Sequence, residues 1–348
     1  MARSKTMNEK TKFKLTQLQD VFRENRTLLI LLQDNPDPDS IASAMALRKL
    51  ANTAANLQCS IAHGGRVGRG ENRALVRYLS LNLRPAEEID FHAFDLIAIV
   101  DTQPRTGNNS LPVEIEPDIV IDHHFCRKET KTCRFTDIRS TYGATVTILF
   151  EYLEAAGIEI DIPLATAMLY AIRSDTQDLG RDTTKEDLNA VMALYPIANK
   201  RMLSEIQRGK VERNYFQMLG DGLRNARVCG PAIVTGLGTV ENPDMIAEIA
   251  DLLLRDDETY WTLCYGVYKD RLLLSIRTSR ESPRADKVIR KIVGRKGNGG
   301  GHPSYAGGQI SLNKTTPKAI ARLENLIVKR LLTALSVDNA TEHKLIQT

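Results

Sequence analysis

Short, unbroken apolar runs that alternate with helical patterns constrain the fold of this chain more than any other feature. The runs TLLILLQ (27–33), DLIAIV (95–100) and DIVI (118–121) are almost wholly apolar. Such runs are typical of strands buried on both faces of a parallel sheet. Because helical patterns separate them, we expect an α/β fold whose parallel sheet carries helices on both faces.

A second, smaller α/β domain is expected towards the C-terminus. Mainly helical patterns extend from 141 to 226, and strand patterns return at 232–237, 261–268 and 271–277. The expected domains are a first domain over 27–196, a helical linker over 197–226, a second domain over 227–335 and a polar tail over 336–348. The basic segment 1–26 is either a disordered arm or a helix that packs on the first domain.

Composition limits the class of protein and of partner. Of 348 residues, 42% are hydrophobic and 26% are charged, which is ordinary for a soluble globular protein. The net charge of +4 permits an anionic small molecule or short nucleic acid, whereas a binder of long duplex DNA is usually more basic. Five cysteines without a CxxC pair argue against disulfides and a thiolate zinc site. With no signal-like or bilayer-length apolar run, we expect a cytoplasmic protein that does not bind membranes.

Acidic residues and histidines follow the predicted strands and one predicted helix. They are Asp37, Asp39, Asp101, Asp122, His123, His124 and Asp175. The carboxyl ends of parallel strands meet at one edge of a sheet, where so many carboxylates would repel one another without cations. Each motif alone has a plain alternative, such as a helix cap, a turn or an ordinary loop. Their combination favours a pair of divalent metal ions, and the oxygen-rich ligand set suits Mn²⁺ or Mg²⁺.

A glycine-rich motif, GNGGGH (297–302), lies in the second predicted domain. Gly299, Gly300 and Gly301 would let backbone amides approach an anion, and His302 could donate to a phosphate. Ten basic and three acidic residues lie between 269 and 296, and among them Arg277 ends a predicted strand, where we expect it to face a substrate. The alternative is a flexible hairpin loop.

Together, NPDPDSIASA, Asp101, the Asp122-His123-His124 triplet, Ser174-Asp175 and GNGGGHPSYAGG resemble the DHH phosphoesterases. More narrowly, they resemble the nanoRNase or oligoribonuclease-like members that carry the DHH-associated C-terminal domain. The resemblance implies two Mn²⁺ ions, one held by Asp37 and Asp101 and the other by Asp39, Asp101, His123 and Asp175. It also implies that His124 contacts the scissile phosphate and that Arg277, Gly299, Gly300, Gly301 and His302 hold the nucleotide. Gln33 stands where the family usually has a histidine ligand, so we expect the site on Asp37 to be the weaker one.

The expected activity is hydrolysis of short RNA oligonucleotides or linear dinucleotides to mononucleotides. Two cations can activate a water molecule for this attack, with Asp101, His123 and His124 as the catalytic residues. Hydrolysis of 3′-phosphoadenosine 5′-phosphate or of cyclic dinucleotides is an alternative. A nucleotide-binding protein that has lost catalysis and a pyrophosphatase or exopolyphosphatase also stay open, although the GGGH motif argues against the last. A homodimer is compatible with all of these.

Overall fold

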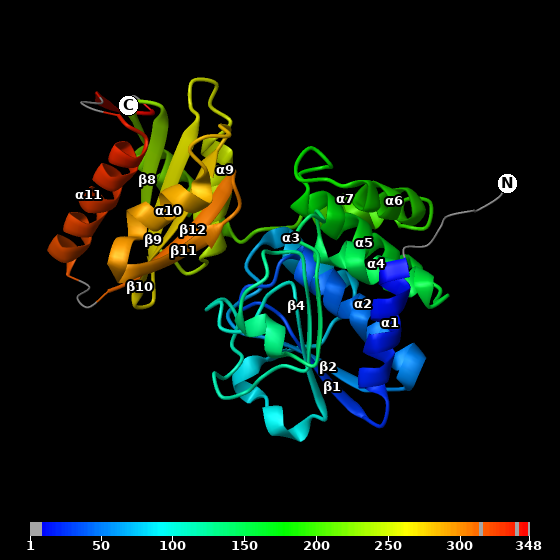
Figure 1. Ribbon diagram of the computed structural model, residues 1–348. Coiled ribbons are helices and arrows are strands. Elements are labelled where there is room, and N and C mark those ends of the chain that lie inside the picture. Colours follow the sequence, from blue (N-terminus) through cyan, green and yellow to red (C-terminus); the bar gives the residue numbers. More distant parts are fainter. Residues whose placement is uncertain (1–8, 313–315, 338–340, 347–348) are drawn as a thin grey trace. The chain divides into compact units, whose positions relative to one another are not determined.

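The computed structural model describes residues 9–312, 316–337 and 341–346. The chain forms two compact units, Met1–Lys210 and Val211–Thr348, and each is described by itself (Figure 1). Residues 1–8 of the expected N-terminal segment, and 338–340 and 347–348 of the expected tail, lie outside the described residues. Every helix in the described part of the chain is too short or too polar to span a lipid bilayer.

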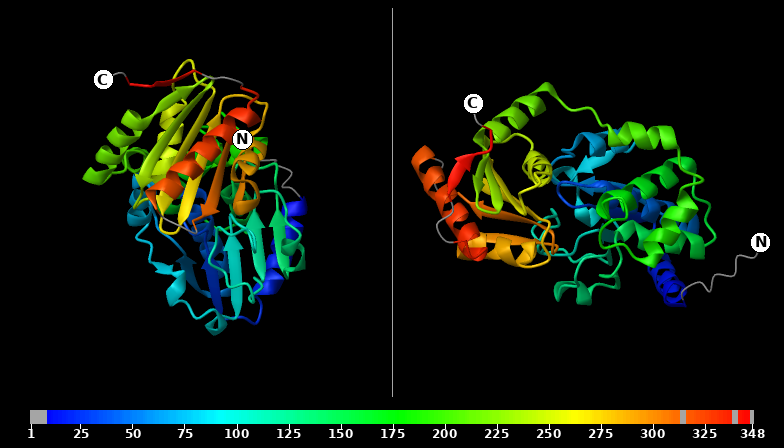
Figure 2. Two further views of the ribbon diagram at one scale, coloured as in Figure 1. Left: turned by 90° about the vertical axis from the view of Figure 1, so that its left-hand side faces the viewer. Right: turned by 90° about the horizontal axis from the view of Figure 1, so that it is seen from above.

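A parallel six-stranded sheet organises unit 1. Its strands are β1 (Thr27–Leu31), β2 (Gln58–His63), β3 (Leu83–Pro85), β4 (Leu96–Val100), β5 (Ile119–Asp122) and β6 (Phe135–Ile138). They follow the order β3-β2-β1-β4-β5-β6, with every pair parallel, as the apolar runs predicted (Figure 2). The strand order reverses between β1 and β4, and ligands of such sheets bind beyond the carboxyl ends of the strands at this reversal.

The helices of unit 1 bury one face of this sheet. They are α1 (Glu9–Phe22), α2 (Pro38–Ala55), α3 (Gly70–Tyr78), α4 (Thr145–Ala155), α5 (Ile162–Asp175), α6 (Lys185–Leu194) and α7 (Lys200–Gln207). Alternate strand residues such as Leu28 and Ile30 pack against them, whereas Leu29 and Leu31 point to the opposite face. That opposite face is covered by the 3₁₀ helices η1 (Ala86–Glu88) and η2 (Phe91–Ala93) and neighbouring loops.

The N-terminal segment, left open by the sequence, contains a helix that belongs to the core of unit 1. Leu15, Leu18, Val21 and Phe22 of α1 are buried in the same cluster as α2 and α4. The predicted linker 197–226 holds two helices, of which α7 lies in unit 1 and α8 (Arg213–Asn225) in unit 2. The sequence analysis did not predict β6 or α9 (Asp244–Leu253), whereas α7 falls within its predicted helical linker.

Unit 2 is built on a mixed seven-stranded sheet. Its strands are β7 (Arg227–Cys229), β8 (Ala232–Thr239), β9 (Trp261–Tyr268), β10 (Arg271–Thr278), β11 (Gly297–Gly301), β12 (Tyr305–Ser311) and β13 (Glu342–Lys344), in the order β11-β12-β10-β9-β8-β7-β13. Among the described strands of unit 2, only β8 and β9 pair in parallel. Helices α10 (Ala285–Val293) and α11 (Pro317–Ala334) cover one face, and α8 and α9 cover the other (Figure 2). Part of the expected polar tail therefore forms a strand.

The glycine-rich motif forms an edge strand rather than a loop, which corrects the loop interpretation. β11 pairs antiparallel with β12, and α10 packs on both strands, where the glycines leave room for it. A Cβ on Gly308 would lie 2.7 Å from a side-chain carbon of Val293, and one on Gly299 would lie 3.3 Å from Ile289. Close helix packing thus accounts for part of this glycine run, independently of any ligand.

Candidate metal centre

Four side chains from four different elements meet at the carboxyl edge of the parallel sheet. Asp39 lies in the first turn of α2, Asp101 follows β4, His123 follows β5 and Asp175 ends α5. Asp39, Asp101 and His123 are 0%, 2% and 6% exposed. Nε2 of His123 lies 3.6 Å from Oδ1 of Asp101 and 3.5 Å from Oδ2 of Asp175.

The potential ligand atoms form two overlapping groups that share His123. One group is Asp101, His123 and His124, and the other is Asp39, His123 and Asp175. Within each group all ligand atoms lie within 4.8 Å of one another. The sequence-predicted residues Asp39, Asp101, His123, His124 and Asp175 are therefore brought together, in a geometry that could hold metal ions.

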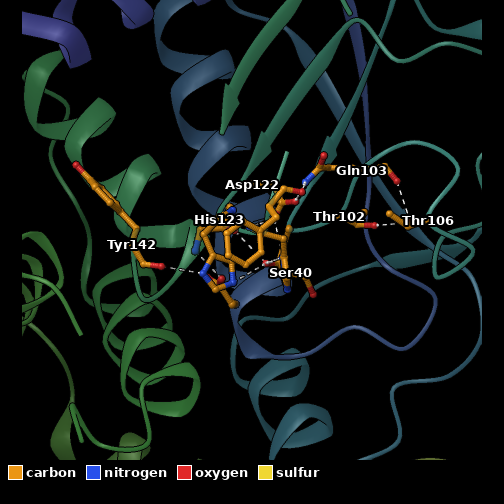
Figure 3. Close-up of polar contacts among 12 residues, drawn as sticks. Ser40, Thr102, Gln103, Thr106, Asp122, His123 and Tyr142 are labelled. Atoms are coloured by element: carbon orange, nitrogen blue, oxygen red, sulfur yellow. Dashed lines mark hydrogen bonds and ion pairs between the residues drawn. The ribbon is translucent and has the colours of Figure 1, made fainter. Parts of the chain in front are cut away.

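A backbone carbonyl orients the ring of His123. Nδ1 lies 3.0 Å from the carbonyl oxygen of Tyr142, so a proton on Nδ1 donates to this oxygen (Figure 3). The carbonyl selects the tautomer in which Nε2, the nitrogen that faces Asp101 and Asp175, carries a lone pair. Histidines that bind metals are commonly fixed in this way by a partner on their other nitrogen.

Asp122 and Gln103 hold the second histidine. Nδ1 of His124 lies 2.8 Å from Oδ1 of Asp122. Nε2 of Gln103 donates to the other carboxylate oxygen of Asp122 at 2.6 Å (Figure 3). Although burial opposes it, the neighbouring His124 lowers the pKa of Asp122 to about 2. The side chain of His124 is 44% exposed, so it can reach a bound ligand while its Nδ1 side is held. The sequence analysis did not single out Gln103, whose role depends on contacts between separate loops.

The carboxylates repel one another strongly. Burial raises the pKa of Asp101 well above its ordinary value, and the charges of Asp37, Asp39 and Asp175 raise it further. Burial likewise raises the pKa of Asp175, with Asp39 and Asp37 adding to the effect. Against burial, which lowers it, the charges of Asp175 and Asp39 raise the pKa of His123. A divalent cation would relieve this repulsion, and hard oxygen donors with imidazole fit Mn²⁺ or Mg²⁺.

The backbone at Asp101 lies in the left-handed region, with φ of 58°. Aspartate tolerates this conformation better than most residues, but it is still costly outside glycine. The amide of Asp101 donates to the carbonyl of Ile121 on the neighbouring strand at 3.0 Å, which holds the turn in place. Strained residues of this kind concentrate at functional sites.

Asp37 and Gln33, the other two residues expected at a metal site, lie outside these groups of close ligand atoms. Asp37 caps α2 by accepting a hydrogen bond from the amide of Ser40 at 2.9 Å. Neither group of close ligand atoms in the described part of the chain includes Asp37, although its charge raises the pKa of Asp101. Gln33 is half-buried and lies two residues beyond the end of β1. Their assignment to a weaker metal site stays a prediction.

In unit 2, Arg277 lies beside Asp251 and Tyr305, and His302 stacks on Tyr305. Arg277 forms an ion pair with Asp251, and its Nη1 donates to Oγ of Ser275 at 2.7 Å. The guanidinium carbon lies 5.6 Å from the ring centroid of Tyr305, and the ring of Tyr305 stacks on His302 at 4.5 Å. The sequence analysis missed Asp251 and Tyr305. Tyr305 could have been found because it falls within the motif GHPSYAGG.

Comparison with known proteins gives two domain matches and several relatives. Residues 27–172 match the DHH family, N-terminal domain, and residues 230–329 match the DHHA1 domain. An uncharacterized protein of Methanocaldococcus jannaschii is 34% identical over 320 residues, which cover 87% of this chain and 65% of that protein. A protein of Deinococcus radiodurans named "Probable manganese-dependent inorganic pyrophosphatase" is 33% identical over 175 residues, covering 47% of this chain and 52% of that protein. This chain thus spans less than two thirds of either relative.

Two solved structures share the fold. An exopolyphosphatase-related protein from Bacteroides fragilis aligns with a TM-score of 0.72, over 93% of this chain and 98% of that chain. RecJ from Thermus thermophilus, in complex with Mn²⁺, aligns with a TM-score of 0.52, over 92% of this chain and 55% of that chain. Both are 15% identical in sequence, so they show the fold alone.

Proposed function

Because the chain belongs to the DHH family and carries a DHHA1 domain, we propose that it is a metal-dependent phosphoesterase. The observation that carries the proposal is the cluster of Asp39, Asp101, His123 and Asp175, in which burial and the neighbouring carboxylates raise the pKa of Asp101 and of Asp175. Relatives named as manganese-dependent pyrophosphatases support Mn²⁺ as the ion.

The protein residues have distinct roles in this reaction. Asp39, Asp101, His123 and Asp175 would hold the ions, with Asp37 as a further ligand and Asp101 between the two sites. Bound divalent ions supply an activated water molecule and neutralise charge on the phosphoryl group. Asp122 orients His124 by contacting Nδ1, so that the other ring nitrogen, Nε2, is left to contact a phosphoryl oxygen.

The substrates that we favour are short RNA oligonucleotides and linear dinucleotides. The stacked rings of His302 and Tyr305 offer an aromatic surface beside Arg277 in the DHHA1 domain. Bases stack on aromatic side chains without sequence preference, whereas an inorganic phosphate needs no such surface. The surplus of basic residues between 269 and 296 suits the phosphates of the same ligand.

Inorganic pyrophosphate is the second candidate substrate. The relative from Deinococcus radiodurans favours it, since one third of its aligned residues are identical to those of this chain. The match covers about half of either protein, so it leaves the contribution of the remaining half open.

A substrate panel with Mn²⁺ tests the proposal. Purified protein would receive RNA of two to seven nucleotides, a cyclic dinucleotide, 3′-phosphoadenosine 5′-phosphate and pyrophosphate, with Asp101→Asn as the matched inactive control. We expect release of mononucleotides from the short RNA by the wild type and not by the variant. Turnover of pyrophosphate alone would favour the second candidate, and no metal-dependent turnover of any phosphoester or phosphoanhydride would refute the phosphoesterase assignment.

A further inference from the structure

We propose that Thr145 is a positioning residue that fixes three of the metal-binding residues relative to one another. The inference rests on the proposed function, because it concerns the same cluster. Thr145 is the first residue of α4 and is completely buried. Neither its sequence context nor the family motifs quoted above pointed to it.

One residue contacts Asp39, Asp101 and His123 directly. The hydroxyl of Thr145 donates to Oδ1 of Asp101 at 2.9 Å and accepts a hydrogen bond from the backbone amide of His123 at 3.2 Å. The backbone amide of Thr145 donates to Oδ2 of Asp39 at 2.6 Å. The next amide, that of Val146, donates to the other oxygen of Asp39 at 2.8 Å.

These three partners come from separate parts of the chain. Asp39 belongs to α2, Asp101 to the turn after β4 and His123 to the turn after β5. Because Thr145 bonds to all three, a displacement of any one of them breaks a buried hydrogen bond. The start of α4 therefore fixes the distances between potential ligands before a metal ion arrives, which is the arrangement that precise binding requires.

The chemistry of threonine suits this position. A hydroxyl can donate one hydrogen bond and accept others, so it can serve Asp101 and His123 together. The β-methyl group restricts rotation about χ1, which keeps the hydroxyl pointing in one direction. Oδ1 of Asp101, which accepts this bond, also lies 3.6 Å from Nε2 of His123, and a carboxylate oxygen has a second lone pair that can bind a cation.

The helix that contains Thr145 also offers a matched control. Thr147, two residues along α4, is buried to the same degree and donates its hydroxyl to Oδ1 of Asp187 at 2.6 Å. Asp187 is a buried carboxylate outside the metal cluster. Thr145→Val and Thr147→Val therefore remove the same kind of hydrogen bond from the same helix, but only the first loses a contact with metal-binding residues.

The test compares Mn²⁺ binding in the full chain by calorimetry and by electron paramagnetic resonance, without substrate. We expect Thr145→Val to weaken Mn²⁺ binding by about 10- to 100-fold, as is typical of residues that support metal ligands. In EDTA, Thr147→Val should lower the unfolding temperature by about as much as Thr145→Val does. It should leave the Mn²⁺ affinity unchanged. Thr145→Ser, which keeps the hydroxyl, should restore most of the affinity. If either valine variant does not fold, the two alanine variants give the same comparison.

Two outcomes would overturn the inference. Wild-type Mn²⁺ affinity in Thr145→Val would show that the hydroxyl does not position ligands, and an equal loss in Thr147→Val would show a general effect on folding. The proposed function fails differently: the affinity pattern would hold, but the wild type would hydrolyse no phosphate ester. Metal binding and turnover, measured on the same samples, separate the two.

Discussion

Asp101 combines a strained backbone with an unfavourable charge. Its φ is 58°, and burial together with Asp37, Asp39 and Asp175 raises its pKa well above the ordinary value. Both features lower the stability of the metal-free protein. Proteins tolerate such local costs at sites where function requires them.

The substitution Asp101→Asn separates the contribution of this residue to activity from its effect on the stability of the metal-free protein. Asparagine also tolerates a positive φ and can accept the hydrogen bond from Thr145, but it carries no charge. We expect the metal-free variant to be more stable at pH 7 by about 1 to 3 kcal/mol, in line with the loss of buried repulsion. Its turnover should fall by more than about 100-fold. Urea unfolding in EDTA and a phosphoesterase assay measure the two effects, and a less stable variant would contradict this account of the charge.

Gln33 provides the second test at this scale. An amide is a weaker ligand for Mn²⁺ than an imidazole, and Gln33 lies just beyond β1, four residues before Asp37. We predict two Mn²⁺ sites of unequal affinity, of which Gln33→His strengthens the weaker by about 10-fold or more. Titration of activity with Mn²⁺ measures the shift, with the choice of substrate as the internal control. Identical titrations for both proteins would mean that Gln33 does not limit the weaker site.

At the scale of elements, a buried ionic network joins β6 and α4 to the loop that orients His123. Arg139, just after β6, binds Oδ2 of Asp137 through Nε at 2.9 Å and Oε2 of Glu151 through Nη1 at 2.6 Å. It also donates to the hydroxyl of Tyr142 at 3.0 Å. Despite burial, which acts in the opposite direction, Asp137 keeps the pKa of Arg139 above its ordinary value. The carbonyl of Tyr142 lies 3.0 Å from Nδ1 of His123, so a network that holds Tyr142 in place also helps to fix the ring of His123.

Arg139→Met should destabilise unit 1 strongly. The substitution leaves the buried carboxylate of Asp137 without its cation, and breaking a buried pair in this way costs about 3–5 kcal/mol. The matched control is Arg201→Met, because Arg201 and Glu205 form an exposed pair on α7 at 3.1 Å. Exposed pairs contribute less than about 1 kcal/mol. Chemical denaturation of both variants measures the difference, and equal losses would show that burial of the network contributes little.

At the scale of the whole molecule, the metal centre links folding stability to pH. The pKa values of Asp101 and Asp175 are raised in the folded state. Between their unfolded values, about 4, and their folded values, the native state binds more protons than the unfolded chain. These groups therefore favour folding at low pH, and their contribution is lost as the pH rises through the folded pKa values.

We predict that metal-free protein loses stability between about pH 5 and pH 7, and that Mn²⁺ reverses this trend. The reversal follows because metal ligands must be deprotonated, so the ions bind and stabilise the fold more strongly at higher pH. Saturation at 100 times the dissociation constant contributes about 2.7 kcal/mol. Denaturation at both pH values, with EDTA or Mn²⁺, tests this. Asp101→Asn serves as the control, and its metal-free stability should depend less on pH than that of the wild type. If the stability of the wild type changed with pH equally with and without Mn²⁺, the proposed linkage would be wrong.

Local patterns in the sequence were sufficient to predict the parallel sheet and the residues at its carboxyl edge. A strand buried on both faces must be apolar along its length, so β1, β4 and β5 are visible in the sequence itself. The carboxylates and histidines that follow them, such as Asp101 and His123, predicted a metal site through their combination, because each motif alone has a plain alternative. Short strands such as β6 give weaker patterns and were missed.

Only the tertiary structure decided which of these residues meet and what holds them. It brings Asp39 into a group with His123 and Asp175, and gives Asp37 a capping bond to Ser40. It also brings Thr145 to Asp39 across 106 residues of sequence. Threonine and glutamine are common in helices and loops, so nothing in their local sequence marks Thr145 or Gln103. Their importance comes from hydrogen bonds between distant segments, which exist only once the strands have paired and the helices have packed.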